Sequence, residues 1–166
     1  MPALSPFPRR SRWPGEATHA AGNRGNEMTL RRISSGGPYE ERVGYSRAVV
    51  AGPWVLVAGS TATVDGEVVG LGDPYAQTRA AFGIALAAVR EAGLDVTDVV
   101  RTRMYVRDIS QQDQIGRAHS ELFDAVRPAA TMVEISRLVH PDLLVEVELE
   151  AYRSPDGSPG GSDTRP

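Results

Sequence analysis

The residues with the clearest potential for chemistry form two charged rows. An arginine row and a glutamate row each occupy alternate positions, with members Arg101, Arg103 and Arg107 in one and Glu146, Glu148 and Glu150 in the other. A carboxylate can act as a general acid or base, and a guanidinium can hold a carboxylate ligand with two hydrogen bonds. Cross-strand ion pairing is the commoner role of such rows, with roughly 0.2 to 1 kcal/mol per pair. The rows alone leave both interpretations open.

Other groups that often carry chemistry are isolated or absent. His19, His119 and His140 share no metal-ligand spacing, so we expect no metal site among them. Ser60 lies outside any Gly-x-Ser-x-Gly string, which argues against a serine nucleophile. The chain has no cysteine, and all 18 basic side chains are arginine. This composition excludes thiolate and lysine Schiff-base chemistry.

The elements that must position these residues can be located from turn and capping signals. Asp65-Gly66 predicts the type I′ turn of a hairpin, and Asp73-Pro74 and Gly93 predict the start and the end of a helix over 75–92. A second helix is expected to start at Ser110, with Asp113 completing a capping box, and to end before Pro128. Strands are predicted at 45–50, 54–58, 61–64, 67–69, 99–107, 131–136 and 145–151.

Two of these strands have one apolar and one charged face. In 99–107 the apolar set is Val100, Thr102, Met104 and Val106, and in 145–151 it is Val145, Val147, Leu149 and Ala151. Helical spacing of Ala81, Ile84, Ala85 and Ala88 indicates that the first helix lies close on the sheet. The order of elements predicts an α+β fold with both helices on one sheet face. Tyr105 and Met132 are expected on the opposite face, which suggests that subunits associate there.

The bulk composition predicts one domain with flexible ends. The chain has 166 residues, of which 41% are hydrophobic, and a formal net charge of −3, which gives no sign of a nucleic-acid or membrane partner. Proline, glycine and polar residues suggest a mostly disordered arm over 1–38, within which Met28 resembles an alternative start, and a disordered tail over 154–166. No apolar run is long enough for a membrane span or a signal peptide, so we expect a cytoplasmic protein.

Four strings in this order resemble the Rid family, also called YjgF or L-PSP endoribonuclease-like, over residues 39–153. They are Gly44-Tyr45-Ser46-Arg47-Ala48-Val49, Arg103-Met104-Tyr105-Val106-Arg107-Asp108, Pro128-Ala129-Ala130-Thr131-Met132-Val133-Glu134-Ile135 and Leu144-Val145-Glu146-Val147-Glu148. The resemblance implies a chorismate-mutase-like fold of the bacillus type, with a mixed sheet of about six strands. It also implies a homotrimer with ligand clefts between subunits and cofactor-free hydrolysis of reactive imines and enamines.

The resemblance also assigns site residues, some of which depart from the family pattern. Glu148 matches the family's acidic residue, and Tyr45 and Gly59 match pocket-lining positions. Ala130 stands where the family has a carboxylate-binding arginine. Gly116 and Met132 replace an asparagine and a cysteine of the family pocket. Loss of the arginine removes charge-assisted bonds of about 1.5 to 3 kcal/mol each. Arg103 is the candidate to compensate, although pairing with a strand glutamate is the commoner role for such a side chain.

These features are compatible with three functions. The first is a cofactor-independent hydrolase, or deaminase, that acts on an imine, an enamine or a similarly activated small metabolite, with Glu148 as acid and base. The second is a non-catalytic trimer that binds a metabolite or a protein, which the missing arginine favours. Endoribonuclease activity ranks lowest, because the sequence has no basic stripe, no aromatic stacking array and no histidine pair.

Overall fold

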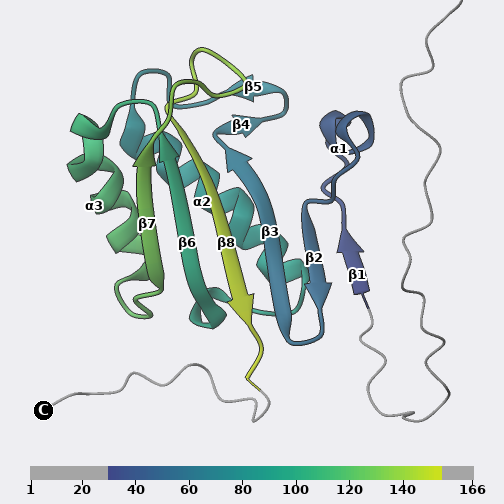
Figure 1. The fold of residues 1–166 in the computed structure, drawn as a ribbon. Coiled ribbons are helices and arrows are strands. Elements are labelled where there is room, and N and C mark those ends of the chain that lie inside the picture. Colours follow the sequence, from purple (N-terminus) through teal and green to yellow (C-terminus); the bar gives the residue numbers. More distant parts are fainter. Residues whose placement is uncertain (1–29, 155–166) are drawn as a thin grey trace, which may run out of the picture.

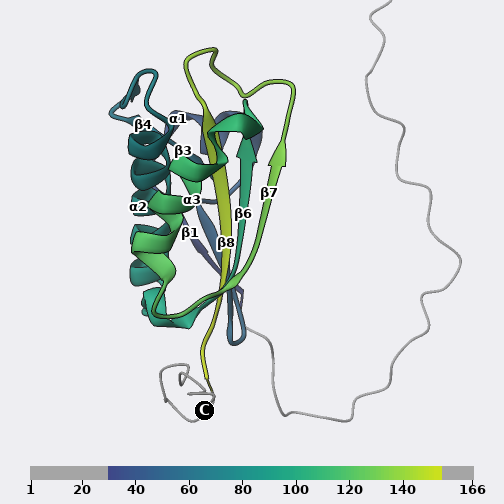
Figure 2. The ribbon, with the colours of Figure 1, turned by 90° about the vertical axis from the view of Figure 1, so that its left-hand side faces the viewer.

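The computed structural model describes residues 30–154, whose main feature is a six-stranded sheet with two long helices on one face (Figures 1 and 2). In spatial order the strands are β1 (Leu30–Ile33), β2 (Ala48–Ala51), β3 (Trp54–Thr61), β8 (Val145–Tyr152), β6 (Val99–Val106) and β7 (Ala129–Glu134). β6 and β7 run parallel, and the other neighbours are antiparallel. The predicted α+β fold with a mixed sheet is confirmed.

The first long helix, α2 (Pro74–Glu91), begins as predicted. The Asp73 side chain accepts a hydrogen bond from the backbone N–H of Ala76 at 3.0 Å, and Pro74 occupies the first turn, where its missing N–H costs no bond. Gly93 follows the helix with φ +82°, a backbone conformation that favours glycine. No helix in the described part of the chain is long and apolar enough to cross a membrane.

The second long helix, α3 (Gln112–Phe123), starts two residues later than predicted. A short 3₁₀ turn, η2 (Ile109–Gln111), precedes it, and the carboxylate of Asp108 accepts bonds from both the backbone N–H and the hydroxyl of Ser110. The Ser110 hydroxyl is therefore directed to Asp108, and the predicted capping box with Asp113 does not form. Arg127, with φ +47°, precedes Pro128 after the helix, where proline disfavours helical backbone.

Short elements complete the described chain. The hairpin of β4 (Thr63–Val64) and β5 (Glu67–Val68) turns at Asp65-Gly66, and both turn residues have positive φ, as predicted for a type I′ turn. η1 (Val96–Asp98) leads into β6. α1 (Pro38–Val43) and β1 were not predicted from the sequence; β1 pairs with β2 and buries Ile33. The disordered arm was expected over 1–38 and the tail over 154–166; residues 30–33 of that arm form β1 instead, and 1–29 and 155–166 lie outside the described residues.

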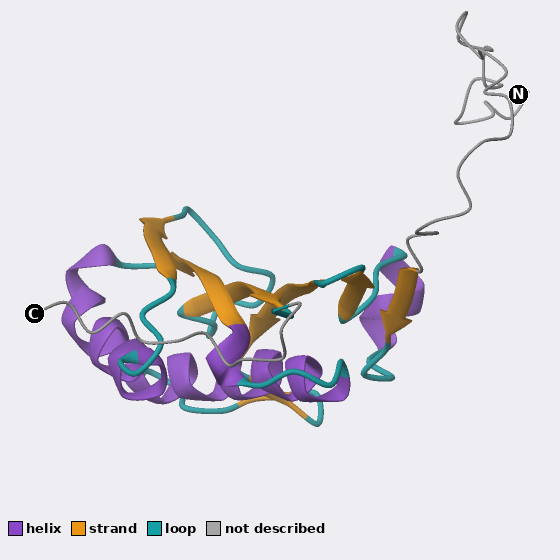
Figure 3. Ribbon diagram, turned by 90° about the horizontal axis from the view of Figure 1, so that it is seen from below, coloured by secondary structure: helices purple, strands orange, loops and turns teal. Residues whose placement is uncertain are grey.

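The hydrophobic core lies between the sheet and the two long helices (Figure 3). Of the predicted α2 stripe, Ala81, Ala85 and Ala88 are buried, whereas Ile84 is only half-buried. The bulk of the buried face comes instead from Phe82, Leu86 and Val89. Small residues alternating with large ones let α2 lie close to β3 and β8 while still filling the interior.

The alternation of β8 is as predicted, and that of β6 is interrupted near its start. Val145, Val147, Leu149 and Ala151 are all buried. In β6, by contrast, a register shift against β8 between Val99 and Arg101 leaves Val100 39% exposed and places Val99 in the core. The prediction that Val100 faces the core was wrong, because a bulge changes which residue points inward.

Candidate functional site

Members of the two charged rows meet on the sheet face opposite the two long helices. Arg103 pairs with Glu148 in the strand register, and its Nη1 lies 2.9 Å from Glu150 Oε1 and 3.5 Å from Glu148 Oε2. Arg101 approaches Glu150 more loosely, at 3.8 Å. The cross-strand pairing considered from the sequence is therefore present, and the positive charge of Arg103 is shared between two carboxylates.

Glu148 occupies a defined position within this row. Its Oε2 accepts hydrogen bonds from the Tyr105 hydroxyl at 3.2 Å and from Arg103. Burial, followed by the charge of Glu148, raises the pKa of Tyr105, so the phenol remains a hydrogen-bond donor at neutral pH. Within residues 30–154, Oε1 has no hydrogen-bond donor, and the Glu148 side chain is 36% exposed. One oxygen is thus held in place while the other is available to a water or a ligand.

A hollow of about 290 Å³ opens beside Glu148. Its wall combines apolar and charged side chains, and includes Ser46, Leu56, Ala58, Arg103, Glu148 and Glu150. This volume suits a small metabolite, since ligand pockets commonly begin at about 300 Å³.

Gly59, a predicted pocket residue, lies under the carboxylate of Glu146. A side chain at position 59 would collide with Glu146 Oε1, so only glycine leaves this space free without a shift. Burial, followed by the negative charge of Glu148, raises the pKa of Glu146, and nearby Arg47 partly offsets the rise. The sequence does not distinguish Glu146 from the other glutamates of its row, because alternation does not show which carboxylate lies against the backbone.

The raised pKa of Glu146 predicts a pH-dependent stability. In the folded state this carboxyl binds its proton more tightly than in the unfolded state, so its stabilising contribution is present below 4.5 and is lost as pH rises through the folded pKa. We expect Glu146→Gln to raise the thermal unfolding midpoint at pH 7 and to change it much less at pH 4. Glu150→Gln, which removes an ion-paired carboxylate, should give no gain. A lower midpoint for Glu146→Gln at pH 7 would contradict the assignment.

Arg47 also reaches this region, although it was not among the site residues predicted from the sequence. Its Nη1 donates to the Gly59 carbonyl at 2.8 Å and to the Ser60 hydroxyl at 2.9 Å, and its Nη2 donates to the Tyr45 hydroxyl at 3.2 Å. The guanidinium also lies 5.6 Å from the centre of the Tyr45 ring. The only signal in the sequence was its place in the Gly44-Tyr45-Ser46-Arg47 string, two residues after the pocket tyrosine.

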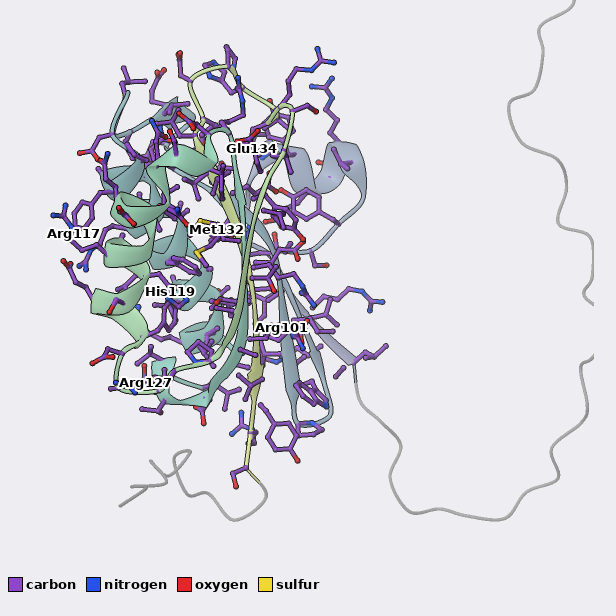
Figure 4. All side chains as sticks on the ribbon, turned by 60° about the vertical axis from the view of Figure 1, so that its left-hand side comes forward. Arg101, Arg117, His119, Arg127, Met132 and Glu134 are labelled. Atoms are coloured by element: carbon purple, nitrogen blue, oxygen red, sulfur yellow. The ribbon has the colours of Figure 1, made fainter. Side chains whose placement is uncertain are left out.

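The remaining predicted site residues, Gly116, Ala130 and Met132, lie on α3 and β7. β8 and β6 separate β7 from β3, which places Ala130 and Met132 about 14 Å from Gly59 at the usual strand spacing. Met132 was predicted on the open face, and that prediction was wrong. It pairs with the buried Met104 in a parallel register, so both side chains point toward the helices and Met132 packs against the core (Figure 4).

The described histidines have structural partners. His119 Nε2 lies 2.9 Å from the Thr102 hydroxyl, and its ring contacts those of Phe82 and Phe123 on the helix side of the sheet (Figure 4). Burial lowers the pKa of His119, which favours the neutral ring. His140 lies beside Asp142 in the loop before β8, and His19 lies outside the described residues. Between residues 30 and 154, no three acidic or histidine side chains are grouped to hold a metal ion.

Comparison with known sequences places this chain in a protein family. The sequence model of the endoribonuclease L-PSP family matches residues 39–153. The chain belongs to this family. An uncharacterized protein of Streptomyces coelicolor, SCO2049, is 48% identical over 124 residues, which cover 75% of this chain and 92% of the relative. The 2-iminobutanoate/2-iminopropanoate deaminase of Escherichia coli is 29% identical over 120 residues, which cover 70% of this chain and 88% of that enzyme.

Solved structures agree with this membership of the L-PSP family. Rv2704 from Mycobacterium tuberculosis, described as a member of the YjgF/YER057c/UK114 family, superposes with a TM-score of 0.68 at 45% sequence identity. The match covers 75% of this chain and 99% of Rv2704. The family resemblance inferred from the four sequence strings is confirmed.

Proposed function

We propose that this L-PSP-family protein hydrolyses a reactive imine or enamine of a small metabolite, without a cofactor, and that Glu148 is the acid and base. The observation that carries the proposal is the position of Glu148 beside the hollow, with Oε2 bound by Tyr105 and Arg103 and Oε1 available. The deaminase name of the Escherichia coli relative supports the same reaction class.

The proposed reaction requires proton transfers that one carboxylate can perform. The imine nitrogen takes a proton from solvent, and Glu148 accepts a proton from water as the oxygen adds to the imine carbon, giving a neutral carbinolamine. Glu148 then gives its proton to the nitrogen, so that the C–N bond breaks and ammonia leaves. It takes the hydroxyl proton as the carbinolamine oxygen becomes the carbonyl, and release of that proton to solvent replaces the one taken up by the imine. An enamine first takes a proton on carbon to become the imine. The sum is imine plus water to carbonyl compound plus ammonia, with no redox change.

We also propose that the active unit is a homotrimer with clefts between subunits. Trp54, Leu56 and Val133 are each more than 40% exposed, and such apolar side chains favour association. The pocket positions on β3 and β8 lie apart from those on α3 and β7, and pairing the open face of one chain with the β7 edge of another would join them. A monomer in light scattering at micromolar concentration would contradict this assembly.

The direct test supplies the purified protein with imines generated in situ by an amino-acid oxidase acting on a panel of amino acids. We expect oxo-acid formation to exceed spontaneous hydrolysis for at least one member of the panel. The control is oxidase with a matched amount of heat-denatured protein. Rates equal to the spontaneous rate for every imine would overturn the proposal.

A second candidate is a family scaffold that binds a metabolite without converting it, which Ala130 in the place of the family arginine favours. A ligand that binds in the hollow and is recovered unchanged would support it. Activity that appears only in Ala130→Arg would also support it. Endoribonuclease activity is disfavoured, because the Arg101 and Arg103 side chains on the open face are matched by glutamates and offer little attraction to a polyanion.

A further inference from the structure

Arg47 differs from Arg101 and Arg103 in the type of groups that surround its guanidinium. Arg101 and Arg103 each lie within 4.0 Å of a carboxylate, whereas no described acidic side chain lies that close to Arg47. All of its hydrogen-bond acceptors within residues 30–154 are neutral carbonyl or hydroxyl oxygens. The Arg47 guanidinium is therefore held in position while its charge stays unmatched.

The positive charge of Arg47 affects two carboxylates that form no ion pair with it among the described residues. Arg47 acts to lower the pKa of both Glu40 and Glu146. The carboxylate of Glu40 is occupied by the hydroxyls of Ser34 and Ser35 and by the Ser35 backbone N–H. That of Glu146 lies against Gly59. Neither carboxylate lies close enough to form an ion pair with the Arg47 guanidinium. A bound anionic ligand would supply the missing negative charge.

The donors of Arg47 are also incompletely used. A guanidinium carries five N–H groups; Nη1 directs its two toward Gly59 and Ser60, and Nη2 directs one toward the Tyr45 hydroxyl. Nε is buried and has no partner among the described residues. A buried donor without an acceptor is uncommon and calls for an explanation. Nη2 keeps one N–H that a ligand can accept, whereas the buried Nε is out of reach of a ligand in this structure.

The position of Arg47 relative to Glu148 suits a shared ligand. The register of β3 and β8 shifts between Val57 and Ser60, and Glu148 stands across from this bulge. Arg47 Nη1 reaches the carbonyl oxygens of Ala58 and Gly59 within the bulge, and Ala58 also lines the hollow beside Glu148. The cation and the proposed acid therefore approach the same irregular stretch of β3 from its two sides.

We propose that Arg47 binds the carboxylate of the substrate and so replaces the arginine that the family has at the position of Ala130. This inference rests on the proposed function, because it specifies the substrate as an imine that carries a carboxylate. Arg103, the candidate from the sequence, is less suited, since a ligand there would compete with Glu150 at 2.9 Å and with Glu148. Arg47 is offered as a substrate-binding residue and takes no part in proton transfer.

A purely structural role for Arg47 makes a different prediction. If the guanidinium only supports the bulge of β3, its loss weakens the fold and affects charged and uncharged ligands alike. If it binds a carboxylate, its loss removes the preference for the charged ligand. The two roles are separated by comparing 2-oxobutanoate with its uncharged amide, which has a similar size and lacks the negative charge.

The experiment measures binding of both probes by calorimetry to the wild-type protein, Arg47→Gln, Arg47→Lys and Arg101→Gln. We expect the wild type to prefer the carboxylate, and Arg47→Gln to lose about 10- to 100-fold in affinity for it with little change for the amide, as expected for lost charge-assisted bonds. Arg47→Lys keeps a charge and a donor for the bulge but lacks the planar fork, so it should fold and show an intermediate loss. Arg101→Gln should retain the preference.

Turnover of an amino-acid-derived imine by the same proteins separates the two proposals. Activity with a raised KM and a nearly constant kcat in Arg47→Gln supports both. Activity with unchanged KM overturns the role of Arg47 and leaves imine hydrolysis standing. Carboxylate binding that depends on Arg47 in a protein with no turnover supports the binding role and overturns the proposed reaction. A wild type that binds the amide as tightly as 2-oxobutanoate overturns the role of Arg47 even if both variants fail to fold.

Discussion

Replacing Glu148 with glutamine is expected to lower kcat for imine hydrolysis by about 100- to 10,000-fold, the usual contribution of a positioned general acid or base. Glutamine retains an oxygen that can accept from the Tyr105 hydroxyl, now 3.2 Å from Glu148 Oε2, so the local structure should persist. It cannot take a proton from water at neutral pH. The loss should therefore appear in kcat with little change in KM, measured as initial rates of oxo-acid formation across a range of imine concentrations.

Glu150→Gln is the matched control for this prediction. Glu150 belongs to the same row, lines the same hollow and binds the same arginine more closely than Glu148 does. Its replacement should change kcat by only a few-fold. If Glu148→Gln and Glu150→Gln lose activity equally, the activity depends on the negative charge of the glutamate row and not on proton transfer by Glu148. Full activity in Glu148→Gln would remove Glu148 from the mechanism.

The second large effect is expected on stability, from Gln77→Leu in α2. Gln77 is fully buried, and its Nε2 donates to the Asp142 carbonyl at 2.8 Å and to the Gly70 carbonyl at 3.3 Å, while its Oε1 accepts from the Leu144 N–H at 2.8 Å. The Gln77 side chain therefore links the turn before α2 to the loop before β8 through hydrogen bonds. Leucine fills a similar volume but leaves the Asp142 carbonyl and the Leu144 N–H without partners, at about 1 to 3 kcal/mol for each group. The Gly70 carbonyl keeps its hydrogen bond from the Asp73 N–H. We expect the free energy of unfolding to fall by about 2 to 5 kcal/mol.

Urea denaturation at fixed protein concentration measures this change, and Gln112→Leu provides the control. Gln112 is exposed at the start of α3, so its replacement should alter stability by no more than about 0.5 kcal/mol. A Gln77→Leu protein as stable as the wild type would mean that water or a shift of the loop satisfies the freed groups.

Much of the local structure followed from neighbouring residues. Asp73-Pro74 predicted the start of α2, because a cap and a proline in the first turn act through bonds within one turn of helix. Asp65-Gly66 predicted its turn from the backbone angles that those residues tolerate. The period of two in β8 predicted its buried and charged faces, since side chains alternate along any strand. The four strings also identified the family, which the comparisons confirm.

Tertiary structure decided the features that depend on strand register and on contacts between distant segments. The bulge in β6 moved Val100 out of the core, and the parallel pairing of β7 with β6 turned Met132 toward the helices. Register also committed Arg103 to two glutamates while leaving Arg47 with neutral partners, a distinction that two arginines in a sequence do not reveal.

The sequence by itself therefore determined the family, the fold class, the main turns and caps, and the identity of Glu148 as the candidate acid and base. Only the tertiary structure decided which arginine of the site lacks a carboxylate partner within residues 30–154 and which side chains share the open face of the sheet. The physical reason is the separation in sequence between the residues that interact. Caps, turns and alternation act between residues a few positions apart, whereas ion pairs, bulges and strand order join segments tens of residues apart, where one shift in register changes every partner.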